Sequence, residues 1–279
     1  MILFDYAEAL ALLAAPPWAF AIGRRLIDLY GRSGMVKENY CGRAVSPALG
    51  PALLLGYLPV AAVEVWSGRD PAAVMARLFL LTGFAFYGLW DDLISDTASG
   101  FRGHFGAWRQ GRLTAGMLKV ITAILAGFLF IGALPFPTWR RLAALPLILL
   151  SANGVNLFDR RPGRALKIFF SGAVLIIFLA RPPVAAAQLL LPLMAVGLAV
   201  APLDLEASAM IGDCGANLLG AALGIGAVLY LPLTLQAALL LFWAGVHLFC
   251  EYFSLSRVIE RNPILRRLDC LGRFREKLI

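Results

Sequence analysis

The stretches "VITAILAGFLFIGAL" (residues 120–134) and "SGAVLIIFLA" (residues 171–180) decide the fold class. Neither carries a charge, and their apolar side chains form continuous runs rather than stripes at helical spacing. A helix needs about 20 mostly apolar residues to span a bilayer. Strands of a membrane barrel would alternate apolar and polar residues instead. The sequence therefore predicts an all-α, polytopic membrane helix bundle.

The rest of the chain has the same character. Of its 279 residues, 60% are hydrophobic and 15% are charged, whereas soluble domains carry roughly 25% charged residues. We predict a single integral-membrane domain over residues 1–279, with a basic tail at 257–279. The bundle should contain about nine to ten spans, and nine can be placed at residues 4–23, 46–66, 73–90, 115–133, 139–157, 166–181, 184–203, 215–231 and 234–256.

The connections between these spans alternate between long, basic segments and short ones. The short connections and the helix ends beside them hold five of the 25 Lys and Arg residues: Arg69, Arg77, Arg140, Arg141 and Arg181. The positive-inside rule then puts the long connections and the C-terminus in the cytoplasm and the N-terminus outside. The net charge of +8 does not indicate a nucleic-acid partner, because no basic groove with interleaved aromatic residues is present.

Acidic residues gather at the predicted cytoplasmic ends of the helices. They are Asp91, Asp92, Asp96, Asp159, Asp204, Glu206 and Asp213. Neighbouring carboxylates repel one another unless positive charge lies between them. Nearby Arg and Lys residues could supply that charge, and so could Mg²⁺, which prefers one or two carboxylates together with water and substrate phosphates. We expect Asp91, Asp92, Asp159 and Asp213 to converge on one cytoplasmic cleft.

Each of these residues also has a simpler interpretation. Asp213 could act only as an N-cap of the helix that follows, because Asp is among the best N-capping residues. Asp91 and Asp92 could be ordinary loop acids, although the helix dipole disfavours anions at a C-terminus. Asn153 and Asn156 could bridge helices, but with Asp159 they form one helical stripe that ends in a carboxylate. That stripe favours the lining of a site.

Five segments together resemble the polyprenyl-phosphate sugar-1-phosphate transferases, a superfamily that includes phospho-N-acetylmuramoyl-pentapeptide transferase and UDP-N-acetylglucosamine–undecaprenyl-phosphate phosphotransferase. They run in order from about residue 24 to 224. The segments are "NYCGRAVSPALG" (39–50), "GLWDDLISD" (88–96), "GRLTAGMLK" (111–119), "NGVNLFD" (153–159) and "MIGDCGANLLG" (210–220). The family fold is a bundle of about ten membrane helices around a cytoplasmic cleft, which agrees with the predicted topology.

The resemblance implies a set of functional residues and partners. Catalytic roles would fall to Asp91, Asp92, Asp159 and Lys119. Asp213, with Asp92, would hold Mg²⁺, or Mn²⁺ in its place. Substrate-binding positions would be Asn153, Asn156, Arg160, Arg161, Arg164, Lys37 and Arg43. The partners would be a UDP-sugar, a polyprenyl phosphate, the bacterial cytoplasmic membrane and, as a further possibility, a second copy of the chain.

The chain departs from the family in two places. Where the family has a glycine-rich stretch after its aspartate, this sequence reads "DRRPGRALK" (159–167). We expect Arg160, Arg161 and Arg164 to bind phosphate, although the positive-inside rule alone would also place arginines here. The family's histidine-rich loop near the C-terminus is missing, which argues against the muramoyl-pentapeptide substrate and leaves the sugar open.

The implied reaction is an attack by a polyprenyl phosphate oxygen on the β-phosphorus of the UDP-sugar, with release of UMP. Such a transfer is helped mainly by positioning and charge neutralisation. Two other functions remain open. A transporter would place acids near mid-membrane, whereas the acids here crowd the helix ends. A non-catalytic relative could act as a membrane assembly partner. The four retained aspartates argue against that alternative, and the missing histidine loop favours it.

Overall fold

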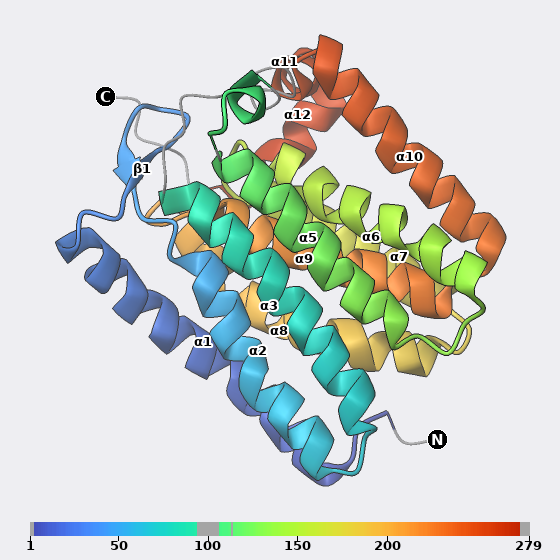
Figure 1. Ribbon diagram of the computed structural model, residues 1–279. Helices are drawn as coiled ribbons and strands as arrows, with labels where there is room; N and C mark the ends of the chain where they lie inside the picture. Colours follow the sequence, from blue (N-terminus) through green and yellow to red (C-terminus); the bar gives the residue numbers. More distant parts are fainter. Residues whose placement is uncertain (1–2, 94–105, 113, 274–279) are drawn as a thin grey trace.

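The computed structural model describes residues 3–93, 106–112 and 114–273, and Figure 1 shows a bundle of long helices. Asp96 and the last six residues of the basic tail lie outside the described residues. The longer elements are α1 (Tyr6–Arg32), α2 (Leu49–Trp66), α3 (Pro71–Leu93), α5 (Ala115–Gly132), α6 (Thr138–Phe158), α7 (Arg164–Leu179), α8 (Pro183–Leu205), α9 (Gly212–Tyr230) and α10 (Leu233–Tyr252). The shorter ones are β1 (Lys37–Glu38), β2 (Ala44–Val45), α11 (Leu255–Arg261) and α12 (Pro263–Cys270).

Each of the nine predicted spans overlaps one long helix, although α1 continues to Arg32, well beyond the predicted end at residue 23. Within the described residues, seven helices are long and apolar enough to cross a membrane: α1, α2, α3, α6, α8, α9 and α10. Helices α5 and α7 are outside that set. The predicted all-α membrane bundle is confirmed at this level, whereas the number of spans and their orientation stay predictions.

Helix α9 is the centre of the bundle. Its sequence "GDCGANLLGAALGIGAVLY" is rich in Gly and Ala, and most of its side chains are buried. Helices α2, α3, α6, α7 and α8 pack around it. Small residues let helix backbones approach closely, which is how membrane helices gain packing energy. The N-terminus of α9, where Asp213 lies, is therefore held in the middle of the bundle end.

A short hairpin covers that end of α9. Strands β1 and β2 are antiparallel, with Lys37 opposite Val45. The chain after β2 pairs with the loop before α9, because the Met210 N–H donates to the Ser46 carbonyl at 2.9 Å and the Leu49 N–H donates to the Met210 carbonyl at 3.3 Å. This pairing fixes the hairpin next to the first turn of α9.

The C-terminal residues form structure rather than a simple basic tail. Helices α11 and α12 follow α10 and turn back over the same end of the bundle (Figure 1). Asn262 caps α12, since its side-chain oxygen accepts from the Ile264 and Leu265 N–H groups. A capping Asn followed by Pro263 is a common start of a helix.

The opposite end of the bundle has its own buried charges. The Arg69 guanidinium donates to both carboxylate oxygens of Glu8, at 2.6 and 2.9 Å, and to the Gln188 side chain at 2.8 Å. Arg77 of α3 pairs with Glu64 of α2. Both acids are almost fully buried, and each faces an arginine.

Candidate functional site

A polar cleft of about 870 Å³ opens at the end of the bundle that the hairpin covers. Its walls come from the hairpin, the ends of α3, α6 and α8, the start of α9, and the segment between α10 and α11. Nine of the predicted site residues line it: Lys37, Asp91, Asp92, Asn153, Asn156, Asp159, Arg160, Arg161 and Asp213. The four aspartates predicted to converge therefore do share one cleft.

Asp92 lies under the floor of this cleft and caps α9 from a different helix. Its side chain has no exposed surface. One carboxylate oxygen accepts from the Asp213 N–H and the other from the Cys214 N–H, each at 3.1 Å. The first N–H groups of a helix need such acceptors, and the N-terminal dipole favours an anion there. We expected Asp92 to bind metal, but its position is that of a structural cap.

Two glycines allow this arrangement. A Cβ on Gly88 would lie 2.3 Å from the Asp213 carbonyl oxygen, so only glycine lets α3 approach α9 this closely. Gly212 has a φ of 65°, a value that residues with a side chain rarely adopt, and a Cβ there would lie 2.5 Å from Asp92 Oδ2. Glycine at position 212 is thus required by the contact with Asp92.

The Asp213 side chain does not cap its own helix. The N-cap position of α9 is Ile211, and no side chain at that position makes a capping hydrogen bond. Instead, Asp213 Oδ2 accepts from Lys37 Nζ at 3.3 Å, and its carboxyl group interacts directly with that of Asp91. The simpler interpretation of Asp213 as an N-cap is therefore wrong.

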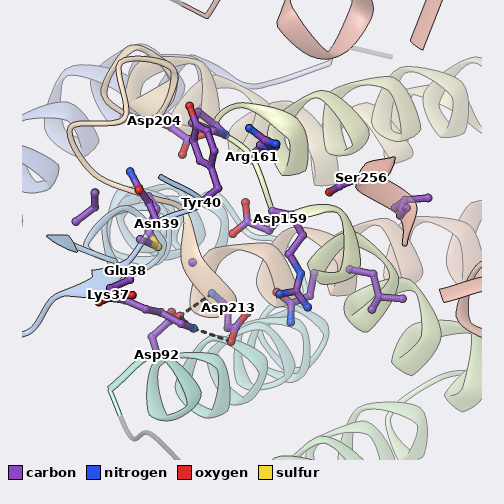
Figure 2. Close-up of a pocket in the computed structure, with 18 of the residues that line it drawn as sticks. Lys37, Glu38, Asn39, Tyr40, Asp92, Asp159, Arg161, Asp204, Asp213 and Ser256 are labelled. Carbon is purple, nitrogen blue, oxygen red and sulfur yellow. Dashed lines mark hydrogen bonds and ion pairs between the residues drawn. The ribbon is translucent and has the colours of Figure 1, made fainter. Parts of the chain in front are cut away.

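Lys37 forms ion pairs with two of the acids, Asp92 and Asp213. Its Nζ lies 3.1 Å from Asp92 Oδ1 and 3.3 Å from Asp213 Oδ2, as the dashed lines in Figure 2 show. Burial disfavours the charged ammonium, but the attraction of Asp213 and Asp92 outweighs it, so the pKa of Lys37 lies above its ordinary value. Lys37 is therefore a cation at neutral pH, and it is 41% exposed to the cleft side.

Lys119 approaches the same group from α5. Its Nζ lies 3.5 Å from Asp91 Oδ2 and 5.3 Å from the centre of the Tyr87 ring. It does not line the cleft itself. Arg43, in the turn of the hairpin, is exposed and does not line the cleft either. These two predicted residues therefore stand around the cleft rather than in it.

The opposite wall of the cleft is formed by the end of α6. Asp159 follows the last turn of this helix and faces the Lys37 side across the cleft (Figure 2). Burial, together with the carboxylates of Asp204, Asp213 and Asp92, raises the pKa of Asp159 well above its ordinary value. A carboxylate in this position favours a bound proton or a bound cation.

The two predicted asparagines differ in their hydrogen bonds. Asn153 Nδ2 lies 2.9 Å from His247 Nε2, and His247 Nδ1 lies 2.7 Å from the Trp243 carbonyl oxygen. This arrangement fits a neutral imidazole that donates from Nδ1 and accepts at Nε2. In contrast, Asn156 Oδ1 is buried and has no hydrogen-bond partner among the described residues. A buried acceptor without a partner costs about 1–3 kcal/mol, so a donor on a ligand would find it favourable.

Of the three arginines after Asp159, two line the cleft and the third is directed away from it. Arg160 and Arg161 line the cleft. The Arg161 guanidinium donates to Glu260 at 2.5 Å and stacks over the Tyr40 ring at 4.3 Å. Arg164 is 3% exposed and donates to both oxygens of Asp269, each at 2.8 Å, and to Ser256 at 3.0 Å. We expected Arg164 to bind phosphate, but its guanidinium is directed to the C-terminal segment.

Several cleft residues were missed at the level of sequence. Glu38, Asn39 and Tyr40 enter the cleft because the hairpin folds over α9. Asp204 was recognised only as an acid at a helix end, yet it is 2% exposed and accepts from the Gly163 N–H at 2.6 Å. Asp204 lies in the last turn of α8 and holds the turn before α7 through the Gly163 N–H, so it is a positioning residue. Nothing near Asp204 in the sequence indicates that contact.

The donor set can be tested for a divalent cation. Within the described residues, no group of three or more His, Cys, Asp or Glu side chains is arranged to hold a metal ion. Mg²⁺ needs only one or two carboxylates, because water and substrate phosphates complete its shell. Asp213 and Asp91 fit that need, since both carboxylates interact and are partly open to the cleft, at 22% and 34% exposed. Asp92 is less accessible, because its side chain has no exposed surface and both its oxygens accept backbone N–H groups, so its role as a metal ligand stays a prediction.

Comparisons with known proteins add no assignment: no protein-family model matches the chain, and no curated protein matches it. The geometry of the cleft therefore carries the functional argument. It combines a capped helix N-terminus, two partly open carboxylates, Lys37 and two arginines, and Lys119 lies beside it. Such a combination is suited to holding a polyphosphate together with a cation.

Proposed function

We propose that the chain is a membrane-embedded phosphotransferase that moves a sugar-1-phosphate from a UDP-sugar to a polyprenyl phosphate and releases UMP. The observation that carries this proposal is the meeting of Lys37, Asp91 and Asp213 in a polar cleft at one end of an apolar bundle. A cleft of about 870 Å³ falls within the range of small-molecule sites, roughly 300–1,000 Å³. One substrate is a lipid, which accounts for a site at the end of membrane-spanning helices.

The proposal includes the finer points of topology. All nine long helices would cross the bilayer, with the N-terminus outside and the cleft facing the cytoplasm. The uneven distribution of Lys and Arg supports this orientation. A bacterial cytoplasmic membrane is the expected location, since the proposed lipid substrate is the carrier of envelope glycans.

The reaction would join two anions, and the chain's residues can reduce their repulsion. A phosphate monoester is largely dianionic near neutral pH, so its oxygen needs no strong base to attack the β-phosphorus. Lys37 would hold the phosphate oxygens, and Lys119 would keep Asp91 ionised and oriented. Asp213 and Asp91 would hold Mg²⁺, which when bound supplies charge neutralisation at the phosphates.

The other wall would hold the nucleotide. Asn156 Oδ1 lacks a donor among the described residues, and the N3–H of uracil is such a donor. Arg161 stacks on Tyr40 at the rim, and its planar fork suits the oxygens of a pyrophosphate. Asp204 would position this wall, because it holds the turn at Gly163.

The test uses purified protein in detergent or nanodiscs with undecaprenyl phosphate, Mg²⁺ and a panel of UDP-sugars. Release of UMP that requires both substrates is the expected result. Absence of UMP with every sugar, from a protein that is folded and monodisperse, would overturn the proposal. The matched control is Glu8→Gln, which alters a buried acid at the far end of the bundle.

A non-catalytic role as a membrane assembly partner is the second candidate. One observation favours it: Lys37 already neutralises Asp92 and Asp213, as expected for a purely structural charge cluster. Binding distinguishes the two candidates before any turnover is seen. A catalytic cleft should bind UDP in the presence of Mg²⁺, whereas a structural cluster should bind neither UDP nor Mg²⁺.

A further inference from the structure

Helix α12 presents an apolar face that no part of the described chain covers. Ile264, Leu268 and Leu271 are 69%, 58% and 67% exposed. Ile264 and Leu268 are four residues apart and lie on one face of the helix, and Leu271 is the C-cap residue that follows the helix. Exposed leucines scattered over a surface need no explanation, but a contiguous stripe marks an interaction surface.

The same segment carries a surplus of positive charge. Among the described residues, its two acids are already paired, Glu260 with Arg161, and Asp269 with Arg164 and Arg273. Four exposed arginines of α11 and α12 have no ion-pair partner within that part of the chain: Arg257, Arg261, Arg266 and Arg267. Three of them line a shallow hollow of about 400 Å³: Arg261, Arg266 and Arg267. The free charge therefore fits an anionic partner.

The position of α12 indicates what that partner is. Lys167, in the first turn of α7, donates to the backbone carbonyls of Leu268 and Asp269, at 3.2 and 2.6 Å. Further along the Lys167 face of α7 lie Leu175 and Phe178, which are 56% and 82% exposed. In an apolar bundle this exposed stripe faces lipid. Helix α12 thus lies across the end of α7 from which this exposed apolar stripe runs.

We propose that α12 lies in the plane of the bilayer surface on the cleft side and binds anionic phospholipid headgroups. Its face with Ile264 and Leu268, together with the following Leu271, enters the boundary between headgroups and acyl chains. Arg267, which borders that face on the helix, contacts headgroup phosphates. Amphipathic helices with a leucine face and an arginine face bind membranes in this way, and anionic lipids attract each basic residue near the surface.

The continuity with α7 favours lipid over a protein partner. A protein that covered α12 would have to lie beside the end of the exposed α7 stripe, at Lys167. The consequence reaches the cleft, because Leu255 and Ser256 of α11 line it and Asp269 of α12 clamps Arg164. Lipid bound at α12 would therefore hold one wall of the cleft in place, whatever the cleft binds.

The experiment measures the depth of spin labels in the full-length protein. Cys41, Cys250 and Cys270 are replaced by serine, and the buried Cys214 is kept. A nitroxide is then attached after Leu268→Cys or, as the matched control on the opposite face, after Arg266→Cys. Both positions are exposed, so neither label should disturb folding. Each protein is reconstituted in phosphatidylcholine vesicles with or without phosphatidylglycerol, and collisions with oxygen and with a water-soluble nickel complex are compared.

We expect the Leu268 label to collide mainly with oxygen in vesicles that contain phosphatidylglycerol, and the Arg266 label to collide mainly with nickel. Arg267→Gln should lower the ratio of inserted to released Leu268 label by about fivefold, the loss of one attraction to an anionic surface. Nickel collisions that dominate at both positions would overturn the proposal, and the face would then belong to a protein partner. Equal insertion with and without phosphatidylglycerol would also overturn it, because the headgroup charge would play no part.

Discussion

The two ends of the bundle both bury charges, but they balance them differently. At the far end, Glu8 faces Arg69 and Glu64 faces Arg77, so each buried acid has an arginine. The cleft is lined by six acids: Glu38, Asp91, Asp92, Asp159, Asp204 and Asp213. Two lysines, Lys37 and Lys119, make the ion pairs with these acids that the described residues contain.

This difference separates a structural charge cluster from a site. A matched pair of buried ions leaves nothing for a ligand to satisfy, and such pairs serve mainly to avoid an unpaired charge. A surplus of acid around an open cleft leaves negative charge that a cation or a proton must neutralise. The ion pairs at the far end thus hold helices together, whereas the acids at the cleft end leave negative charge for a bound cation or proton.

The largest expected effect is that of Asp213→Asn. The amide loses the charge that pairs with a divalent cation, while Asp92 continues to cap α9 from α3. We expect UMP release to fall by at least about a hundredfold, as when preorganised charge is removed from a phosphate or oxyanion site. Elution of the variant as a single species, with wild-type thermal stability, is the control. Full activity in a stable variant would show that the acidic surplus has no catalytic role.

A change at the far end should show the opposite pattern. Glu64→Gln leaves Arg77 buried without its anion, and breaking a buried pair costs about 3–5 kcal/mol. We therefore expect a clear loss of stability in an SDS unfolding titration, with the activity per folded molecule unchanged. If the activity per folded molecule also fell, the two ends of the bundle would not be independent.

The pH dependence of stability should reveal Asp159. Its pKa is raised in the folded protein, so the folded state binds a proton more readily than the unfolded state. Stability contributed by this proton is present at low pH and is lost as the pH rises from the ordinary Asp value of about 3.9 through the raised value. In buffer with EDTA, Asp159→Asn should remove that fall and stabilise the protein at neutral pH. An unchanged pH profile would mean that the cleft does not raise the pKa of this carboxylate.

The smallest effect is expected from conservative changes in the arginines. Arg161→Lys keeps the charge but loses the planar fork and the stacking on Tyr40, which is worth about 0.5–1 kcal/mol at exposed sites. A two- to fivefold rise in the KM for the UDP-sugar should follow. Arg164→Lys should instead lower stability and leave KM unchanged, because Arg164 binds Asp269. A raised KM with unchanged stability in Arg164→Lys would instead show that Arg164 binds the substrate.

Much of the fold could be predicted because its signals are local in the sequence. Apolar runs such as 171–180 predict helices by length alone. The convergence of Asp91, Asp92, Asp159 and Asp213 followed from a second simple fact, that all lie at helix ends on one side of the bundle. Neither prediction needed any knowledge of which helices pack together.

What could not be predicted depends on tertiary contacts. Asp92 becomes a cap of α9 only because Gly88 lets two helices approach, and nothing near Asp92 in the sequence indicates that contact. Arg164 binds Asp269 in the C-terminal segment, far away in sequence. From the local sequence "DRRPGR" alone, Arg164 was predicted to bind phosphate. The helix α12 did have local signals, Asn262 and Pro263, but the density of arginines around them suggested only a basic tail.

Whether the cleft holds a cation is best measured by a titration with Mn²⁺ in the presence of UDP, followed by electron paramagnetic resonance as the loss of the free-ion signal. We expect one saturable site in the wild-type protein and in Glu8→Gln, and loss of that site in Asp213→Asn. Its control is the thermal stability of all three proteins without metal. Absence of saturable binding in the wild type, or equal binding in Asp213→Asn, would contradict the claim that the acidic surplus of the cleft holds a cation for phosphate chemistry.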